Sequence, residues 1–197
     1  MAKTIVSRKT QITEIAQALF QEQGYAATSM RHLAAEVGIE PASLYNHFQS
    51  KEEILRDICF GMASEFNKNL DQLNDKSMLP SKWLAEAIKI HILFILANNS
   101  AAGVFFEEWR HLSQPYRLDF EWMRKQYEQR FIAVIKLGQR SNEFIDIQPQ
   151  LFVLQLFGAM NHIHKWYNPD GKWSAKKIAN QMSEVFLNGI KNSAVVN

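Results

Sequence analysis

The sequence predicts an all-α protein with an N-terminal helix-turn-helix domain of three helices and a C-terminal helical bundle, about nine helices in total. Apolar residues recur at helical spacing along almost the whole chain, and no segment shows a convincing period of two. Of the 197 residues 47% are hydrophobic, and only eight are Gly and five Pro, a composition typical of a packed helical chain. A glycine at position 38 separates two short amphipathic segments, which predicts the helix-turn-helix.

The segment that carries most information runs from residue 28 to residue 53. Residues 30–37 have apolar side chains at i, i+3, i+4 and i+7, which predicts a helix with one buried face. Gly38 allows a sharp turn, and Pro41 suits the first position of a second helix. In that helix Leu44 and Phe48 share the inner face, so we expect small, hydroxylated, amide and aromatic groups on the outside: Ala42, Ser43, Tyr45, Asn46 and His47. Such a polar outer face can enter a major groove.

Further helices are expected on both sides of this motif. Residues 10–23 carry an apolar stripe that Gly24 ends, and Ser50 with Glu53 forms a capping box that opens a long helix reaching about Leu73. Residues 74–77 read as a polar loop. Beyond it the pattern predicts helices over residues 80–97, around 104–112, and over 115–137, 149–167 and 174–189. We expect a DNA-binding domain at residues 1–56 and a ligand-binding and dimerisation domain at residues 57–197.

The motif segments resemble a known family. The pieces that match are Ala16, Phe20 and Gly24-Tyr25 in the first helix, Thr28 to Ala34, Val37-Gly38, Leu44 to Phe48 (LYNHF) and Ser50 to Leu55 (SKEEIL). Together they make residues 10–56 similar to the DNA-binding domain of the tetracycline-repressor (TetR) family of bacterial regulators. One departure is Glu40, where that family usually has Ser or Thr as the helix cap.

The motif and the resemblance indicate which residues contact DNA. Side chains and backbone N–H groups at the start of a helix can meet phosphate, whereas those on the second motif helix can reach base edges. The expected DNA-binding residues are Thr28, Ser29, Arg31, Pro41, Ala42, Ser43, Tyr45, Asn46, His47 and Lys51, the last as a phosphate clamp. Residues 1–60 hold six basic and seven acidic side chains, so binding must rest on where cations lie: Lys3, Arg8, Lys9, Arg31 and Lys51.

The C-terminal half also carries a resemblance, through Phe106-Glu107-Glu108, Tyr127-Glu128, residues 158–161 and residues 166–172. These are similar to a TetR branch that includes sensors of acyl-CoA thioesters and related lipid catabolites, although His162 stands where that branch commonly has tryptophan. The resemblance implies a ligand cavity lined by Met62, Phe66, Phe105, Phe106, Trp109, Tyr127, Phe131, Phe152, Leu156, Met160 and Asn161. The same spacing is equally typical of plain core, and that alternative stays open.

The resemblance further implies a homodimer built as a four-helix bundle from the last two long helices. Gly158 and Ala159 permit close helix approach, and the expected dimerisation residues are Phe157, Ile163, Trp166, Ile178, Met182, Val185 and Phe186. The alternative is that these faces cover the core of a single subunit.

Other classes of function find little support. The histidines lack the spacing of metal ligands, no phosphate-cradling glycine loop or nucleophile motif is present, and we expect no enzyme, metal or cofactor. The lone Cys59 fits a reducing cytosol, the N-terminal ten residues carry no secretion signal, and no apolar run is long enough for a membrane span. The expected location is the bacterial cytoplasm, at the nucleoid when bound to DNA.

The sequence therefore predicts a DNA-binding transcriptional regulator of the helix-turn-helix type. We expect a repressor that a small hydrophobic effector releases from a palindromic double-stranded operator, the effector being an acyl-CoA, another lipid catabolite or an unidentified hydrophobic compound or drug. The alternative is a helical ligand-binding protein or enzyme that retains the motif only as scaffold. A nonspecific architectural DNA binder fits poorly with the acidic balance of residues 1–60.

Overall fold

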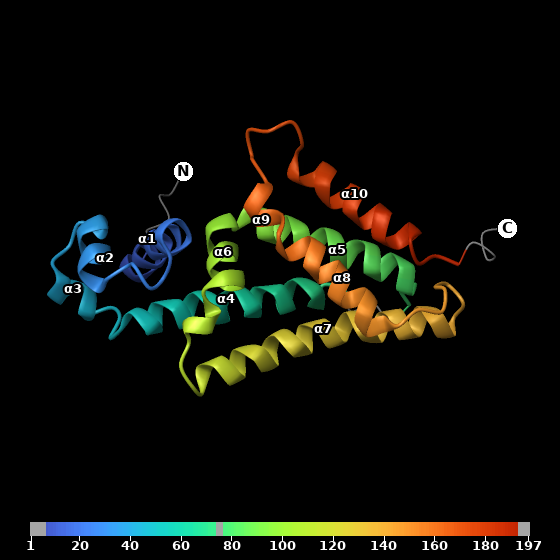
Figure 1. Cartoon of the computed structure of the whole chain (residues 1–197), viewed down its shortest axis with the longest axis horizontal. Coiled ribbons are helices and arrows are strands. Elements are labelled where there is room, and N and C mark those ends of the chain that lie inside the picture. Colours follow the sequence, from blue (N-terminus) through green and yellow to red (C-terminus); the bar gives the residue numbers. More distant parts are fainter. Residues whose placement is uncertain (1–6, 74–76, 193–197) are drawn as a thin grey trace. The chain divides into compact units, whose positions relative to one another are not determined.

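The computed structural model describes residues 7–73 and 77–192. Within them the chain forms ten α-helices and one 3₁₀ turn: α1 (Arg8–Gln23), α2 (Met30–Val37), α3 (Pro41–Tyr45), α4 (Lys51–Asp71), α5 (Pro80–Ala97), α6 (Asn99–Glu107), η1 (Trp109–His111), α7 (Tyr116–Arg140), α8 (Pro149–Asn161), α9 (Ile163–Trp166) and α10 (Ala175–Asn188) (Figure 1). These residues contain no strand beyond one isolated antiparallel bridge, between Phe144 and Lys191. The predicted all-α class is confirmed. Lys3 and most of the expected loop, residues 74–76, lie outside the described residues.

Two compact units divide the chain. The first comprises Met1–Ala63 and Asn99–Phe120, and the second comprises Ser64–Asn98 and Glu121–Asn197. The sequence places Asn99–Phe120 in the C-terminal domain, yet this segment packs within the first unit. The cause is the close contact of α6 with α1, where a Cβ added at Gly103 would lie 3.1 Å from the Cγ of Gln21. A domain boundary at residue 56 stays a prediction.

In the first unit, the predicted apolar faces form one core. Ile12, Ala16, Leu19 and Phe20 of α1 are buried, as are Leu33 and Ala34 of α2, Leu44 of α3, Phe48, and Ile54, Leu55 and Ile58 of α4. Burying one of the larger of these side chains, a Leu, Ile or Phe, contributes roughly 1.5–3 kcal/mol. This core determines which faces of α2 and α3 remain at the surface.

In the second unit, α5 is the central helix. It is apolar on nearly every side and packs most extensively against α10, with further contacts to α8 and α9. The Oγ of Ser183 in α10 donates to the carbonyl oxygen of Ala85 in α5 at 3.0 Å. A polar group buried at this helix pair is therefore satisfied.

The predicted helix over residues 149–167 is interrupted at His162. The carbonyl oxygen of Asn161 lies 2.7 Å from the Nδ1 of His164, while the backbone N–H of Lys165 bonds to the carbonyl of His162. The imidazole of His164 thus bonds to the carbonyl oxygen that would accept the backbone N–H of Lys165 in a continuous helix. The regular pattern of helical hydrogen bonds is therefore interrupted here. Helix α8 therefore ends at Asn161, and α9 is a single turn.

Candidate DNA interface and effector region

The turn between α2 and α3 has the geometry that the sequence predicts. Ser29 is the N-cap of α2, and its Oγ accepts the N–H of His32 at 3.0 Å. Gly38 ends α2 in the left-handed region with φ 71°, and its N–H bonds to the carbonyls of Ala34 and Ala35. Pro41 then begins α3, while Glu40 makes no side-chain cap bond. The proline and the glycine therefore determine this turn without help from a capping side chain.

The outer surface of α3 is polar and open to solvent. Tyr45 is 52% exposed, Ala42 and Asn46 are also exposed, and Pro41, Ser43 and His47 are half-buried. Within the described residues, no side-chain hydrogen bond or ion pair engages the phenol of Tyr45, the amide of Asn46 or the imidazole of His47. Leu44 and Phe48, by contrast, are fully buried. Three groups with unused donors and acceptors thus share the face expected to read DNA.

Two of the three positions expected at the start of α2 lie at the surface. Ser29 and Arg31 are exposed, and in residues 7–73 and 77–192 the guanidinium of Arg31 has no hydrogen bond or ion pair. Thr28 differs from the prediction, since it is only 1% exposed and its Oγ1 donates to the carbonyl of Gly24 at 3.0 Å. Its hydroxyl closes the turn between α1 and α2 and is not accessible to a phosphate.

Lys51 also differs from the prediction of a phosphate clamp. Its Nζ donates to the carbonyl oxygens of Tyr25 and Thr28, each at 2.7 Å, and lies 3.5 Å from that of Ala26. The ammonium also sits 4.2 Å from the centre of the Tyr25 ring. Burial lowers the pKa of Lys51, and the nearby charge of Glu108 opposes that shift. All three N–H donors face the α1–α2 turn, so this lysine is not retained as a DNA contact.

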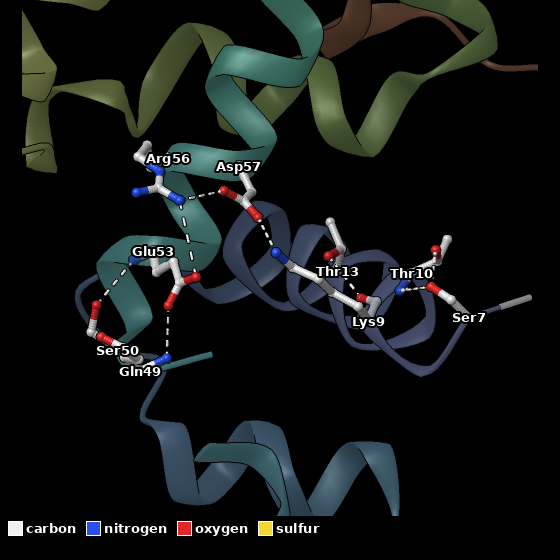
Figure 2. A network of polar contacts seen from close by, with 9 residues as sticks. All are labelled: Ser7, Lys9, Thr10, Thr13, Gln49, Ser50, Glu53, Arg56 and Asp57. Atoms are coloured by element: carbon white, nitrogen blue, oxygen red, sulfur yellow. Dashed lines mark hydrogen bonds and ion pairs between the residues drawn. The ribbon is translucent and has the colours of Figure 1, made fainter. Parts of the chain in front are cut away.

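A polar network joins the start of α1 to the start of α4 (Figure 2). The Nζ of Lys9 lies 2.8 Å from Asp57, whose other oxygen lies 2.9 Å from Arg56. Burial acts to raise the pKa of Asp57, but the bonds from Lys9 and Arg56 hold it below its ordinary value. Glu53 accepts the backbone N–H of Gln49 at 2.7 Å, so the carboxylate of the predicted capping box reaches one residue further back than Ser50 (Figure 2).

This network reduces the number of cations free to meet DNA. Lys9 also lies 4.7 Å from the centre of the Phe48 ring, and Arg56 lies 5.3 Å from that of Tyr116. Of the five cations that the sequence singles out, Lys9 and Lys51 have partners inside the first unit. Among these five cations, Arg31 and the exposed Arg8, which bonds to the nearby Gln11 at 2.9 Å, are the described ones without a carboxylate or backbone partner.

The second unit holds a polar chain inside an aromatic cluster. The Nδ1 of His91 lies 3.0 Å from the hydroxyl of Tyr127, and its Nε2 lies 3.0 Å from the Oδ1 of Asn161. Phe66 stacks on the imidazole with ring centres 4.7 Å apart, and Phe157 meets it edge-on at 5.4 Å. Burial lowers the pKa of His91 to about 4, so its imidazole is neutral at pH 7. Burial also raises the pKa of Tyr127.

The predicted ligand-binding residues fall into two groups. Phe66, Tyr127, Phe131, Phe152, Leu156, Met160 and Asn161 belong to the second unit, where Tyr127 and Phe131 both contact Phe157. Met62, Phe105, Phe106 and Trp109 belong to the first unit, where Phe105 and Trp109 contact Phe120. A single cavity shared by the eleven stays a prediction. Sequence reasoning missed His91, although a lone histidine on a helix that is apolar all round was the available signal.

The predicted dimerisation residues are not equivalent. Phe157, Ile163 and Ile178 are buried within the second unit, so they offer little apolar surface to a partner, although Ile178 borders the groove described next. Trp166 and Val185 are exposed by 52% and 63%. Met182 and Phe186 are half-buried beside them, and these four residues line a groove of about 530 Å³ with Trp173. Leu151 and Leu154 of α8 are also exposed.

Neither a metal site nor a single membrane-spanning helix is found in the described part of the chain. No group of three or more His, Cys, Asp or Glu side chains in it could hold a metal ion. Across the same residues, no single helix is both long and apolar enough to cross a membrane, and only α5 and α6 taken together reach that length and composition.

These features define a class, that of helical proteins with a helix-turn-helix motif near the N-terminus. The family within this class follows from comparison with known proteins. The profile described as "Bacterial regulatory proteins, tetR family" matches residues 12–58, and the one described as "Tetracyclin repressor-like, C-terminal domain" matches residues 79–190. The second match covers more than half of the chain. The chain belongs to the TetR family of bacterial regulatory proteins, and the prediction of a regulator in place of an enzyme is confirmed.

Relatives of similar length are found by sequence and by structure. The chain is 26% identical over 185 residues to the transcriptional repressor KstR2 of Rhodococcus jostii, covering 93% of this chain and 91% of that protein. It is 23% identical to the fatty acid metabolism regulator of Bacillus subtilis over 92% of this chain and 95% of the other. The solved KstR2 of Mycobacterium tuberculosis superposes with a TM-score of 0.91 at 26% identity, over 98% and 99% of the two chains.

Proposed function

We propose that this TetR-family repressor binds a palindromic operator as a homodimer and is released by a small hydrophobic effector of the acyl-CoA or lipid-catabolite class. Recognition of DNA is supported above all by the surface side chains of Tyr45, Asn46 and His47, whose donors and acceptors have no partner in the described residues. The neighbouring Leu44 and Phe48 are buried. Exposed Ser29 and Arg31 at the start of α2 supply phosphate contacts.

A homodimer is supported by the groove around Val185 and by the exposed leucines of α8. A large apolar surface that one subunit leaves open is the usual sign of an interface. In a symmetric dimer the two α3 helices would lie about 34–36 Å apart, one turn of DNA, and would face equivalent half-sites. The contact residues we propose are Trp166, Met182, Val185 and Phe186, with Leu151 and Leu154 as additions from the structure.

The effector class is supported by the aromatic cluster around His91. The Nε2–H of the neutral imidazole donates to the Oδ1 of Asn161, which leaves the amide N–H groups of Asn161 as donors. An N–H donor beside aromatic side chains can hydrogen-bond to the carbonyl oxygen of an uncharged thioester, ester or ketone. The relatives agree in kind, since the B. subtilis protein regulates fatty acid metabolism by name. AibR, which shares this fold with a TM-score of 0.82 at 23% identity over 91% of this chain and 97% of that one, was solved with isovaleryl coenzyme A and operator DNA.

Release of DNA requires that the effector bind more tightly to a dimer state in which the separation of the two α3 helices does not match the operator. An affinity ratio of about 100 between the two states corresponds to about 2.7 kcal/mol, and operator DNA disfavours the effector by the same amount. Helix α4 contributes residues to both units and is the element that we propose carries this coupling. A regulator of this kind acts on the chromosome, so we place it in the bacterial cytoplasm.

A mobility-shift assay against DNA that flanks the gene tests the proposal. The wild-type protein should shift one fragment at low salt, and Tyr45→Ala with Asn46→Ala should lose that shift while remaining folded, since both side chains are exposed. Gln126→Ala, at an exposed position on α7, is the matched control. A folded dimer that shifts no fragment at low salt would favour the alternative, a ligand-binding protein with the motif as scaffold.

A thermal-shift series tests the effector. Acyl-CoAs of increasing chain length should raise the melting temperature and weaken the DNA shift together. An acyl-CoA that stabilises the protein but strengthens DNA binding would reverse the sign of the regulation. Absence of stabilisation at every chain length would remove this ligand class.

A further inference from the structure

The α1–α2 turn is held by more than its own hydrogen bonds. The carbonyl oxygen of Tyr25 accepts both the backbone N–H of Thr28 at 3.3 Å and the Nζ of Lys51 at 2.7 Å. The carbonyl of Thr28, directly before the N-cap Ser29, accepts a second bond from the same ammonium. The first residue of α4 therefore bonds to the two ends of the turn that leads into α2.

A short segment beyond α6, residues 108–113, packs against this same turn. The imidazole of His111 stacks on the Tyr25 ring, with ring centres 5.1 Å apart and planes 28° from parallel. His111 also lies 3.4 Å from a carboxylate oxygen of Glu108, and the other Glu108 oxygen would lie 3.9 Å from a Cβ placed on Gly24. The charge of Glu108 stabilises the ammonium of Lys51, since it raises the pKa of that group against the effect of burial.

The 108–113 segment is also bonded to the start of α4. The backbone N–H and the Oγ of Ser113 donate to one carboxylate oxygen of Glu52, at 2.7 Å and 2.5 Å. These two bonds lower the pKa of Glu52. Lys51 and Glu52 are adjacent in the chain. The side chain of Lys51 hydrogen-bonds to the α1–α2 turn, and that of Glu52 hydrogen-bonds to the 108–113 segment.

We propose that Tyr25, Lys51 and Glu52 are positioning residues for DNA binding: together with the 108–113 segment they form a latch that sets where α2 begins. Ser29 and Arg31 follow Thr28, whose carbonyl is bonded to Lys51, by one and three residues, so a shift of the turn displaces the groups proposed to meet phosphate. The inference deepens the proposed function and rests on it for the DNA step. It assigns Lys51 a role opposite in kind to a phosphate contact.

The chemistry of the site distinguishes the two roles. A phosphate contact needs a positive charge at the surface, and arginine would supply it at least as well as lysine. A latch needs a compact ammonium whose three donors converge on carbonyls of one turn, which a planar guanidinium cannot do. Lys51→Arg should therefore behave like Lys51→Met if the latch is correct, and like the wild type if Lys51 contacts phosphate.

The first experiment follows amide hydrogen exchange and needs no DNA. Lys51→Met, Lys51→Arg and Ser113→Ala should each speed exchange of the Thr28 amide by about tenfold or more, because hydrogen bonds to charged groups are lost. Lys136→Met, which removes an exposed lysine of α7, should leave that rate unchanged. Exchange of Thr28 that stays at the wild-type rate in all three variants would overturn the latch, whether or not the protein binds DNA.

The second experiment measures operator affinity against salt concentration. The three latch variants should bind at least about tenfold more weakly with the slope of log K against log salt unchanged, because no phosphate contact is removed. A Lys51→Met slope shallower by about 0.9 for each protomer, with Lys51→Arg at wild-type affinity, would show a phosphate contact and overturn the proposal.

Discussion

The Nε2 atom of His91 lies 3.0 Å from the Oδ1 atom of Asn161, at the centre of the aromatic cluster in the second unit. An amide oxygen accepts only, so this contact places the imidazole proton on Nε2 and leaves Nδ1 to accept the hydroxyl of Tyr127. His91 thereby joins a donor and an acceptor while remaining uncharged. It is a neutral bridge in an apolar interior, and its protonation would add an unpaired charge there.

Acid should destabilise the protein through His91. The pKa of this imidazole is lowered from 6.5 to about 4 on folding, so between those values the unfolded chain binds a proton that the folded chain does not. The contribution of His91 to the free energy of unfolding is therefore fully present above pH 6.5. It decreases as the pH drops towards 4, by up to about 1.4 kcal/mol per pH unit. Urea unfolding of the wild type at pH 7, 6, 5 and 4 measures that loss.

The variant His91→Phe isolates this contribution. At pH 7 it should lower the unfolding free energy by about 1–3 kcal/mol, because the buried polar groups of Tyr127 and Asn161 lose their hydrogen-bond partner. The deficit should shrink as pH falls towards 4, since the variant has no imidazole to protonate. His162→Phe, at an exposed histidine, is the control and should follow the wild-type profile. A His91→Phe deficit that is constant over this pH range would contradict the account.

Operator binding should depend only moderately on salt. Arg8 and Arg31 are the predicted DNA-facing cations that lack a carboxylate or backbone partner in the described residues. With these two as the phosphate contacts, a dimer neutralises on the order of four phosphates, which corresponds to a slope of log K against log salt of about −3.6. Arg31→Ala should weaken binding to all duplexes alike and make that slope shallower by about 1.8 for the dimer. Arg140→Ala, at an exposed site on α7, should change neither quantity. Filter binding from 50 to 300 mM KCl provides the measurement.

The buried faces of the motif helices could be predicted from the sequence, because apolar periodicity determines which side of each helix packs inward. The spacing of Leu33, Leu44 and Phe48 predicts which faces turn inward, and Gly38 adopts the left-handed conformation that its place predicts. Residue type did not predict the roles of Thr28 and Lys51. A lysine at a helix start can bond phosphate or a neighbouring carbonyl with the same three donors, and only the position of the α1–α2 turn decides between them.

The C-terminal half shows the same limit for apolar residues. Helical spacing indicates that Phe157, Ile163 and Val185 are candidates for packing, but it does not tell a subunit interface from the core of one unit. The structure buries the first two and exposes the third. His91 escaped prediction for a related reason: its partners Tyr127 and Asn161 are 36 and 70 residues away in the chain, so no local pattern connects them.

Base reading should reside in the amide of Asn46, the residue that directly follows α3, more than in the side chains of α3 itself. An asparagine amide can bond two edges of one base in the major groove, worth about 1–3 kcal/mol of discrimination. Asn46→Ala should therefore lower affinity for the operator by that amount for each half-site and leave affinity for unrelated duplex almost unchanged. Competition titrations with both duplexes measure the ratio. Equal losses on the two duplexes would instead make Asn46 a backbone contact.

Charge introduced on the exposed face of α10 should separate the subunits and abolish operator binding. Val185 is 63% exposed beside Met182 and Phe186, and a glutamate there would have to be desolvated twice, on both sides of the symmetry axis, in any dimer that buries this groove. Val185→Glu should give a folded monomer by sedimentation with unchanged helical circular dichroism. Because one helix-turn-helix reads only half of a palindrome, its operator affinity should fall by several orders of magnitude. Leu137→Glu places the same charge at a 53% exposed leucine of α7, away from this groove, and should remain dimeric. A dimeric Val185→Glu with full operator binding would mean that the subunits meet on another surface.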